Sequence, residues 1–301
     1  MAAVISPVDR LRQKLGIRDH LTKCALAEFV CTAFFMFVGF SVNAQNVIAR
    51  RPAYDYFGGH FAWGLALFFS VQMGFGLSGS HMNPAISFLF YSFGEIGFGR
   101  FMYYVIAQVL GSFLGAAMAF AVYYDGINAM DGGHRMVHGI NATAGIFSTY
   151  PKDFMSVPGA IIDQVACTAV MVVCVLVVIE KRNNIPKSLQ PFFIGLMLCF
   201  TGMCLGQDGN AMNPARDFAP RVFTYLAGYG VEVFSYKNFT WFWIPIVAPM
   251  IGSLVGGWGY QLAIGIHLDD EDEEEEHILP MVIKPPPTID DMAYMENRAL
   301  P

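Results

Sequence analysis

The sequence predicts an all-α membrane protein with six transmembrane helices and two re-entrant half-helices arranged as an inverted repeat. Three observations lead to this fold class. The 301 residues are 55% hydrophobic and only 14% charged, whereas about 25% of residues are charged in a typical soluble domain. Six apolar stretches approach or reach the length of a membrane span, and the tripeptide Asn-Pro-Ala occurs once in each half of the chain.

The apolar stretches are predicted to be helices. About 20 helical residues cross the roughly 30 Å of hydrocarbon in a bilayer. Inside lipid every backbone polar group needs an internal partner, and a helix supplies one. The predicted spans cover approximately residues 24–47, 59–77, 101–124, 159–179, 190–206 and 241–266.

Basic residues predict the orientation, because cytoplasmic loops are enriched in Lys and Arg. A cytoplasmic N-terminus places these residues inside: Arg10, Arg12, Lys14, Arg18, Lys23, Arg100, Lys181, Arg182 and Lys187. The residues then placed outside are Arg50, Arg51, Arg135, Lys152 and Lys237, of which Arg50 and Arg51 run against the trend. The glycosylation sequon at Asn141 also falls outside. We expect a multi-pass protein of the plasma membrane with both termini in the cytoplasm.

The regions flanking the spans are polar. Residues 1–22 form a basic cytoplasmic segment without the apolar core of a cleavable signal peptide. Residues 23–266 hold the two repeats, about 23–124 and 159–266, joined by an outer loop at about 125–158. The tail at 267–301 contains an unbroken acidic run from Asp269 to Glu276 and is expected to be disordered, because like charges repel. The cysteines show no metal-binding spacing, so neither a metal nor a cofactor is predicted.

The two Asn-Pro-Ala segments predict the half-helices. Asn83-Pro84-Ala85 and Asn213-Pro214-Ala215 each follow an apolar helix and open a stretch too short to span, about 84–93 and 214–226. Asparagine is a strong N-cap, and proline is well tolerated at the first helical position. Three spans per half is an odd number, so the halves insert in opposite orientations. Their half-helices therefore enter from opposite sides and meet near the midplane.

This arrangement predicts a passive channel rather than an enzyme. The positive ends of both half-helices face one path through the membrane, where they repel cations. Each Asn amide can donate a hydrogen bond to a passing water or hydroxyl, which interrupts a chain of proton-conducting waters. No nucleophile–base pair, HExxH motif or phosphate-binding loop occurs in the apolar region.

Several polar residues in the apolar region are expected to have defined positions. Glu28 lies 55 residues before Asn83, and Asp163 lies 50 before Asn213. We expect both acids to accept hydrogen bonds from the re-entrant backbone; the alternative is a proton-coupled transporter in which they carry protons. His81 is expected near the cytoplasmic mouth, as a structural or pore-lining group or as a pH gate. Arg216 is expected to be functional, with backbone carbonyls as partners, because intramembrane charges seldom serve packing alone.

These motifs resemble the aquaporin superfamily, the major intrinsic proteins, over about residues 23–266. The aquaglyceroporin branch is the closer match. Its typical features here are Asp217 after Asn-Pro-Ala-Arg, Arg221, Pro245-Ile246, Tyr123-Tyr124-Asp125 and the loop motif Phe147-Ser-Thr-Tyr-Pro151. The resemblance implies a homotetramer that passes glycerol, water and other small uncharged solutes, with urea as a further candidate. It also implies that Asp217 helps to support its half-helix.

The resemblance further implies a selectivity filter in the outer half of the pore, lined by Trp63, Gly202, Asn210 and Arg216. Arg216 lies about 4.5 Å outward of Asn213 along the half-helix. Water-selective relatives have histidine at the position of Gly202, so glycine widens the constriction. Asn210 departs from the aromatic or apolar residue usual in glycerol channels and would favour water or urea. A water-selective pore is therefore the alternative, although Gly202 and Asp217 count against it.

Overall fold

The computed structural model describes residues 6–49, 56–207 and 209–268, and its regular structure there is helical. The helices, in chain order, are α1 (Pro7–Leu15), α2 (His20–Ile48), α3 (Tyr56–Gly74), α4 (Pro84–Ser92), α5 (Phe98–Val122), α6 (Tyr124–Asp131), α7 (Val157–Ile179), α8 (Gln190–Cys204), α9 (Pro214–Thr224), α10 (Glu232–Ser235) and α11 (Ile244–Ala263). Short turns of helix occur at Ala144–Ile146, Lys181–Asn183, Tyr225–Tyr229 and Gly265–His267.

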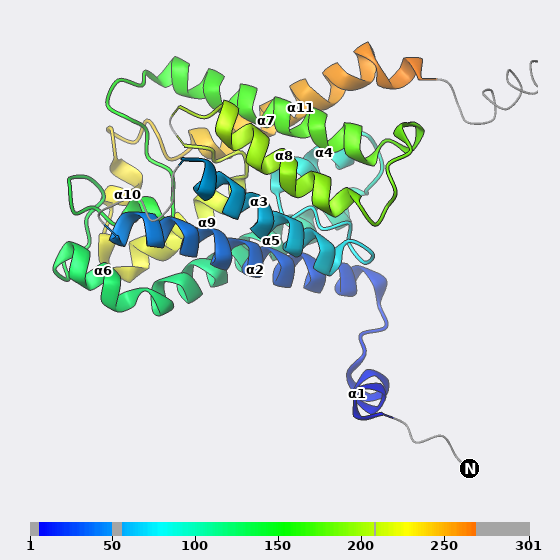
Figure 1. Ribbon diagram of the computed structural model, residues 1–301, viewed down its shortest axis with the longest axis horizontal. Helices are drawn as coiled ribbons and strands as arrows, with labels where there is room; N and C mark the ends of the chain where they lie inside the picture. The colour runs from blue at the N-terminus through cyan, green and yellow to red at the C-terminus, as the bar shows by residue number, and fades with distance from the viewer. Residues whose placement is uncertain (1–5, 50–55, 208, 269–301) are drawn as a thin grey trace, which may run out of the picture.

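Six long helices lie side by side and enclose the short helices α4 and α9 (Figure 1). They are α2, α3, α5, α7, α8 and α11, and each falls on one predicted span, which confirms the predicted fold class. By length and composition, α2, α5 and α7 are each sufficient to cross a membrane. In Figure 1, α2 begins and α11 ends at the same end of the bundle.

The half-helices α4 and α9 begin at the two Pro residues of the repeated tripeptide, as predicted. The preceding Asn83 and Asn213 are their N-caps and have extended backbone conformations. α4 has nine residues and α9 has eleven, so neither is long enough to cross a bilayer.

Equivalent glycines hold the two repeats together in the same way. Gly115 of α5 faces α2, and a Cβ built on it would lie 2.7 Å from the carbonyl oxygen of Ala33. Gly256 of α11 faces α7, and its Cβ would lie 2.7 Å from the Cα of Ala169. Small residues let helix backbones approach closely, which is how helices associate in lipid. The same close packing in both halves is what an inverted repeat requires.

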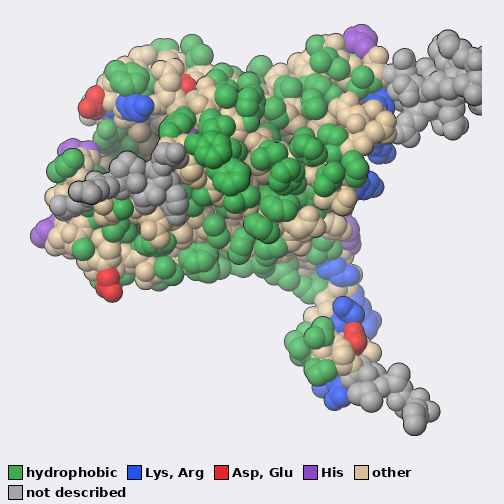
Figure 2. All heavy atoms as spheres, viewed as in Figure 1, with side chains coloured by type: hydrophobic (Ala, Val, Ile, Leu, Met, Phe, Trp, Pro, Cys, Tyr) green, Lys and Arg blue, Asp and Glu red, His purple; other side chains and the backbone are tan. Residues whose placement is uncertain are grey.

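Large apolar side chains cover the outside of the bundle (Figure 2). Leu110 of α5 is 56% exposed and Ile162 of α7 is 68% exposed. Soluble monomers seldom expose apolar patches on this scale, whereas a lipid-facing surface has this character.

The polar flanking segments and one loop complete the description. Within residues 1–22, predicted to be a polar and basic segment, residues 7–15 form α1, capped by Ser6 with Pro7 in its first turn. The acidic run from Asp269 and the arginines Arg50 and Arg51 lie outside the described residues.

Candidate functional site

A cavity of about 760 Å³ lies between the two halves of the bundle. Tyr56, at the start of α3, lines one end of it. Ile179 and Gln190, where α7 ends and α8 begins, line the other. Because these elements lie at opposite ends of the bundle in Figure 1, the cavity follows the length of the protein.

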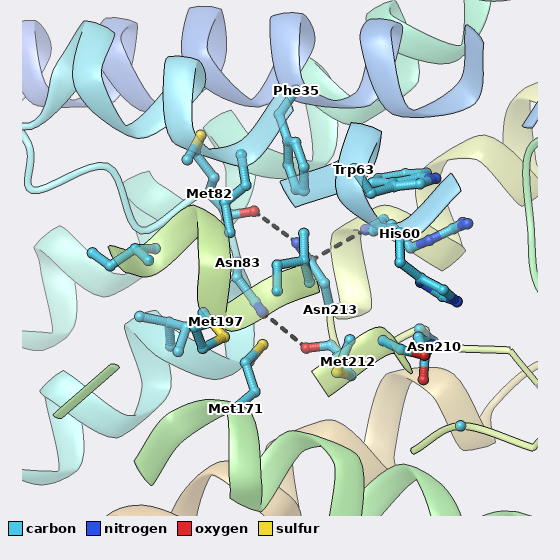
Figure 3. Close-up of a pocket in the computed structure, with 18 of the residues that line it drawn as sticks. Phe35, His60, Trp63, Met82, Asn83, Met171, Met197, Asn210, Met212 and Asn213 are labelled. Carbon is cyan, nitrogen blue, oxygen red and sulfur yellow. Dashed lines mark hydrogen bonds between the residues drawn. The ribbon is translucent and has the colours of Figure 1, made fainter. Parts of the chain in front are cut away.

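Asn83 and Asn213 meet in the middle of the cavity and are held by crossed hydrogen bonds (Figure 3). The Asn83 Nδ2 donates to the carbonyl of Met212 at 2.9 Å, and the Asn213 Nδ2 donates to the carbonyl of Met82 at 2.8 Å. Each Oδ1 accepts from a first-turn N–H of its own half-helix, at 2.9 and 3.0 Å. A side-chain amide has two N–H groups, so each Asn keeps one for a solute.

The residues preceding these asparagines share an unusual backbone. Met82 has φ of 47° and Met212 has φ of 48°, both in the left-handed region. This conformation costs a non-glycine residue about 1–2 kcal/mol. Its occurrence at equivalent positions shows that both turns are built to the same geometry, in which each Met carbonyl accepts from the opposite Asn.

Glu28 is fully buried and fastens the first re-entrant segment. Its Oε1 accepts from the Ser78 hydroxyl at 2.7 Å and from the backbone N–H of His81 at 2.9 Å. Its Oε2 accepts from the N–H of Met82 at 2.7 Å and from Gln108 Nε2 at 2.8 Å. These donors occupy the carboxylate on both oxygens, and Glu28 does not line the cavity.

In the second half this task is shared between Asp163, which accepts from the re-entrant backbone, and Gln164. Gln164 Oε1 accepts from the N–H of Met212 at 3.4 Å, and its Nε2 donates to the carbonyl of Gly209 at 2.7 Å. Asp163 accepts instead from the N–H of Gln207 at 3.1 Å. Successive residues point about 100° apart around a helix, so Gln164 faces the re-entrant turn and Asp163 faces its edge.

Arg216 and Trp63 both line the cavity and lie against each other. The Arg216 Nη1 donates to the carbonyl of Phe147 at 2.8 Å. Its guanidinium carbon lies 5.3 Å from the Trp63 ring centre and 5.2 Å from that of Phe40, within cation–π range. The Trp63 indole N–H donates to Asn43 at 3.0 Å, which fixes the ring.

Gly202 and Asn210 also line the cavity and are hydrogen-bonded to each other. The Asn210 Nδ2 donates to the carbonyl of Gly202 at 3.1 Å. The same carbonyl accepts from the Tyr56 hydroxyl at 3.0 Å. Sequence reasoning missed Tyr56 and also His60, whose ring lies against Gly202. A signal was present, because His60 and Tyr56 lie three and seven residues before Trp63 and so share its face of α3.

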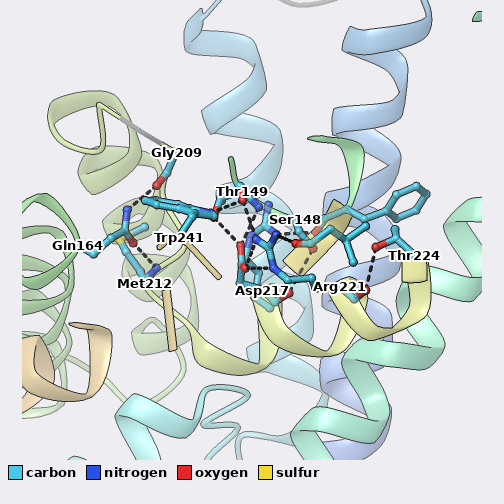
Figure 4. A network of polar contacts seen from close by, with 12 residues as sticks. Ser148, Thr149, Gln164, Gly209, Met212, Asp217, Arg221, Thr224 and Trp241 are labelled. Atoms are coloured by element: carbon cyan, nitrogen blue, oxygen red, sulfur yellow. Dashed lines mark hydrogen bonds and ion pairs between the residues drawn. The ribbon is translucent and has the colours of Figure 1, made fainter. Parts of the chain in front are cut away.

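A buried ion pair within the second half-helix is hydrogen-bonded to the loop that precedes α7 (Figure 4). Asp217 Oδ1 accepts from Arg221 at 2.6 Å, and its Oδ2 accepts from the N–H of Thr149 at 2.7 Å. Arg221 donates onward to the carbonyls of Thr149 and Val233, both at 2.7 Å. The Trp241 indole N–H donates to the Thr149 carbonyl at 2.6 Å. The loop motif that includes Phe147 and Thr149 therefore packs into the protein next to Arg216.

Two further residues identified in the sequence, His81 and Asn141, are in the described part of the structure. His81 lines the cavity, its Nδ1 lies 3.1 Å from the Ser87 hydroxyl, and its ring stacks on Phe90. Asn141 is half-buried, and the hydroxyl of its sequon residue Thr143 is buried against Asp131 and Tyr229. In the part of the chain that the structure describes, no group of three His, Cys, Asp or Glu side chains is placed to hold a metal ion.

The chain is similar to known proteins both in sequence and in fold. Residues 18–260 match the family described as "Major intrinsic protein". Mouse Aquaporin-9 is 43% identical over 87% of this chain and 89% of its own, and human Aquaporin-10 is 34% identical over 88% of each. A solved structure, the aquaglyceroporin from Plasmodium falciparum, superposes with a TM-score of 0.73 at 28% identity, covering 81% of this chain and 97% of that one. The chain therefore belongs to the major intrinsic protein family, on the aquaglyceroporin branch of the aquaporin superfamily.

Proposed function

We propose that this protein is a passive channel for glycerol, water and other small uncharged solutes, urea among them, and that it excludes ions and protons. The observation that carries this proposal is the meeting of Asn83 and Asn213 inside one long cavity, each capping a half-helix and each held by the other half. Two helix N-termini and two free amide N–H groups then face the solute. The family membership supports the same function.

The four filter residues divide the work of selection. Arg216 donates hydrogen bonds to solute hydroxyls while its charge opposes cations. The Trp63 ring provides an apolar surface for the carbon backbone of a polyol. Gly202 adds no side chain to the constriction. Asn210 contributes chiefly by fixing the Gly202 carbonyl, since its amide nitrogen is bonded there.

The remaining polar residues support the half-helices. Glu28 holds the first re-entrant segment, Asp163 together with Gln164 holds the second, and Asp217 ties α9 to the outer loop. Glu28 accepts hydrogen bonds on both oxygens and stands away from the cavity, which argues against a proton-coupled transporter. We assign His81 a pore-lining structural role near the cytoplasmic mouth.

We also propose a plasma-membrane homotetramer with both termini in the cytoplasm and the sequon at Asn141 outside. The start of α2 and the end of α11 at one end of the bundle support the shared side of the termini. Glycosidase treatment tests the sequon, because an Asn141→Gln variant would then migrate like the treated protein. Cross-linking in membranes tests the tetramer.

The main test is stopped-flow light scattering of proteoliposomes under water, glycerol and urea gradients. We expect glycerol permeability well above that of empty liposomes, without proton leakage. A water-selective pore is the second candidate, because a histidine lies against Gly202 and narrows that side of the cavity. Water flux without glycerol flux would establish this alternative and overturn the glycerol proposal.

A further inference from the structure

The space left by Gly202 is already occupied by a side chain from another helix. A Cβ built on Gly202 would collide with the Nδ1 of His60 and would lie 3.0 Å from its Cε1. His60 belongs to α3, one turn before Trp63, so the two rings project from the same face (Figure 3). The constriction therefore contains an imidazole, delivered by α3 rather than by α8.

The polar atoms around Gly202 differ in what they can offer a solute. The Gly202 carbonyl already accepts from Tyr56 and from Asn210, which uses both of its lone pairs. The Tyr56 ring packs edge-on against the imidazole, with ring centres 4.6 Å apart. No residue that the structure describes forms a hydrogen bond with the His60 ring. The ring nitrogens therefore have no hydrogen-bond partner among the described residues, although the ring itself is held in place.

A solute hydroxyl in the filter needs a hydrogen-bond acceptor, and the His60 ring can supply one. A hydroxyl group both donates and accepts hydrogen bonds, but the Arg216 guanidinium only donates. One of the guanidinium nitrogens already donates to the carbonyl of Phe147. A neutral imidazole has one donor and one acceptor nitrogen. Because it lines the same cavity, His60 can accept a hydrogen bond from a solute hydroxyl, which Arg216 cannot.

We propose that His60 is a specificity-determining residue of the constriction, a hydrogen-bonding group for the hydroxyls of a polyol that raises glycerol flux relative to water flux. The inference rests on the proposed glycerol function and names the residue that completes its filter. Gly202 and His60 then form one unit, because the absence of a side chain on α8 is what admits the ring from α3.

The first experiment separates polarity from size at position 60. His60→Phe keeps an aromatic ring without ring nitrogens, whereas His60→Gln keeps a donor and an acceptor. In proteoliposomes we expect His60→Phe to lower the ratio of glycerol to water permeability by roughly threefold to tenfold, the effect of one hydrogen bond. His60→Gln should retain most of that ratio. Water flux reports that each variant is folded and open.

The second experiment tests the contact with Gly202. Gly202→Ala should depress glycerol flux in the native background, because the new methyl group must displace the imidazole. The same substitution should have little effect in a His60→Ala background, where the space is empty. Equal effects in both backgrounds would show that the two positions do not share one site.

The outcomes distinguish this inference from the proposed function. A native protein that passes no glycerol overturns both. A native protein that passes glycerol, with the glycerol-to-water ratio unchanged in His60→Phe or equally reduced in His60→Gln, overturns the role of His60 alone. A loss in His60→Phe that His60→Gln restores establishes it.

Discussion

The ion pair between Asp217 and Arg221 is expected to be a main support of the second half-helix, and Asp217→Asn tests this. Both side chains are fully buried. Asparagine has nearly the same shape, but its amide must replace one of two oxygens, each of which accepts hydrogen bonds. If the amide nitrogen faces Thr149, the backbone N–H there loses its acceptor. If it faces Arg221, two donors oppose each other.

The magnitude follows from the burial. Removing one partner of a buried ion pair costs about 3–5 kcal/mol, because the other charge is left uncompensated. For a protein of this size that corresponds to a fall in melting temperature of roughly 6–20 °C. The measurement is the fraction of detergent-solubilised protein that stays monodisperse after heating.

The matched control is Asp125→Asn, the same chemical change at an exposed position in α6. Exposed substitutions of this kind usually alter the free energy of unfolding by less than about 0.5 kcal/mol. If both variants lose stability equally, or if neither does, the ion pair is not a support of the fold and the reasoning fails.

Three more predictions concern the repeat. Gly256→Ala should destabilise the protein by about 1–3 kcal/mol in the same heating assay, because a Cβ there would lie 2.7 Å from the Cα of Ala169. The control is Gly259→Ala on the same helix, where a Cβ meets nothing within 4 Å, and this variant should be neutral or stabilising. Asn213→Asp should abolish water flux in proteoliposomes, since a carboxylate has no N–H to donate to the opposite carbonyl; native flux would contradict this. Gln164→Ala should lower thermal stability more than Asp163→Ala, and the reverse order would restore Asp163 as the main support of the second half-helix.

The fold was predictable because its signals are local. The six spans depend on the length and apolarity of single segments, and the half-helices depend on an N-cap followed directly by proline. Arg216 was identified for a similar reason, since a charge stands out in an apolar stretch. Such features can be read from a few neighbouring residues without knowledge of the tertiary structure.

Contacts between distant segments were harder to predict. The choice between Asp163 and Gln164 depends on the rotation of α7 about its axis, which packing sets and spacing does not. His60 reads as an ordinary polar residue until α8 is placed beside it with a glycine at the contact. Thr149 lies 68 residues from Asp217, and only the folded loop brings them together.

The crossed amides of Asn83 and Asn213 have a consequence for biosynthesis. The acceptor for Asn83 is the carbonyl of Met212, 129 residues later in the chain. During translation the first half-helix therefore lacks this hydrogen-bond partner until about half of the second repeat has been synthesised. The Asn83–Asn213 pair at the centre of the pore is therefore completed late, when the two halves of the chain pack together. A nascent chain halted before residue 212 should insert its first spans yet leave Asn83 accessible to water.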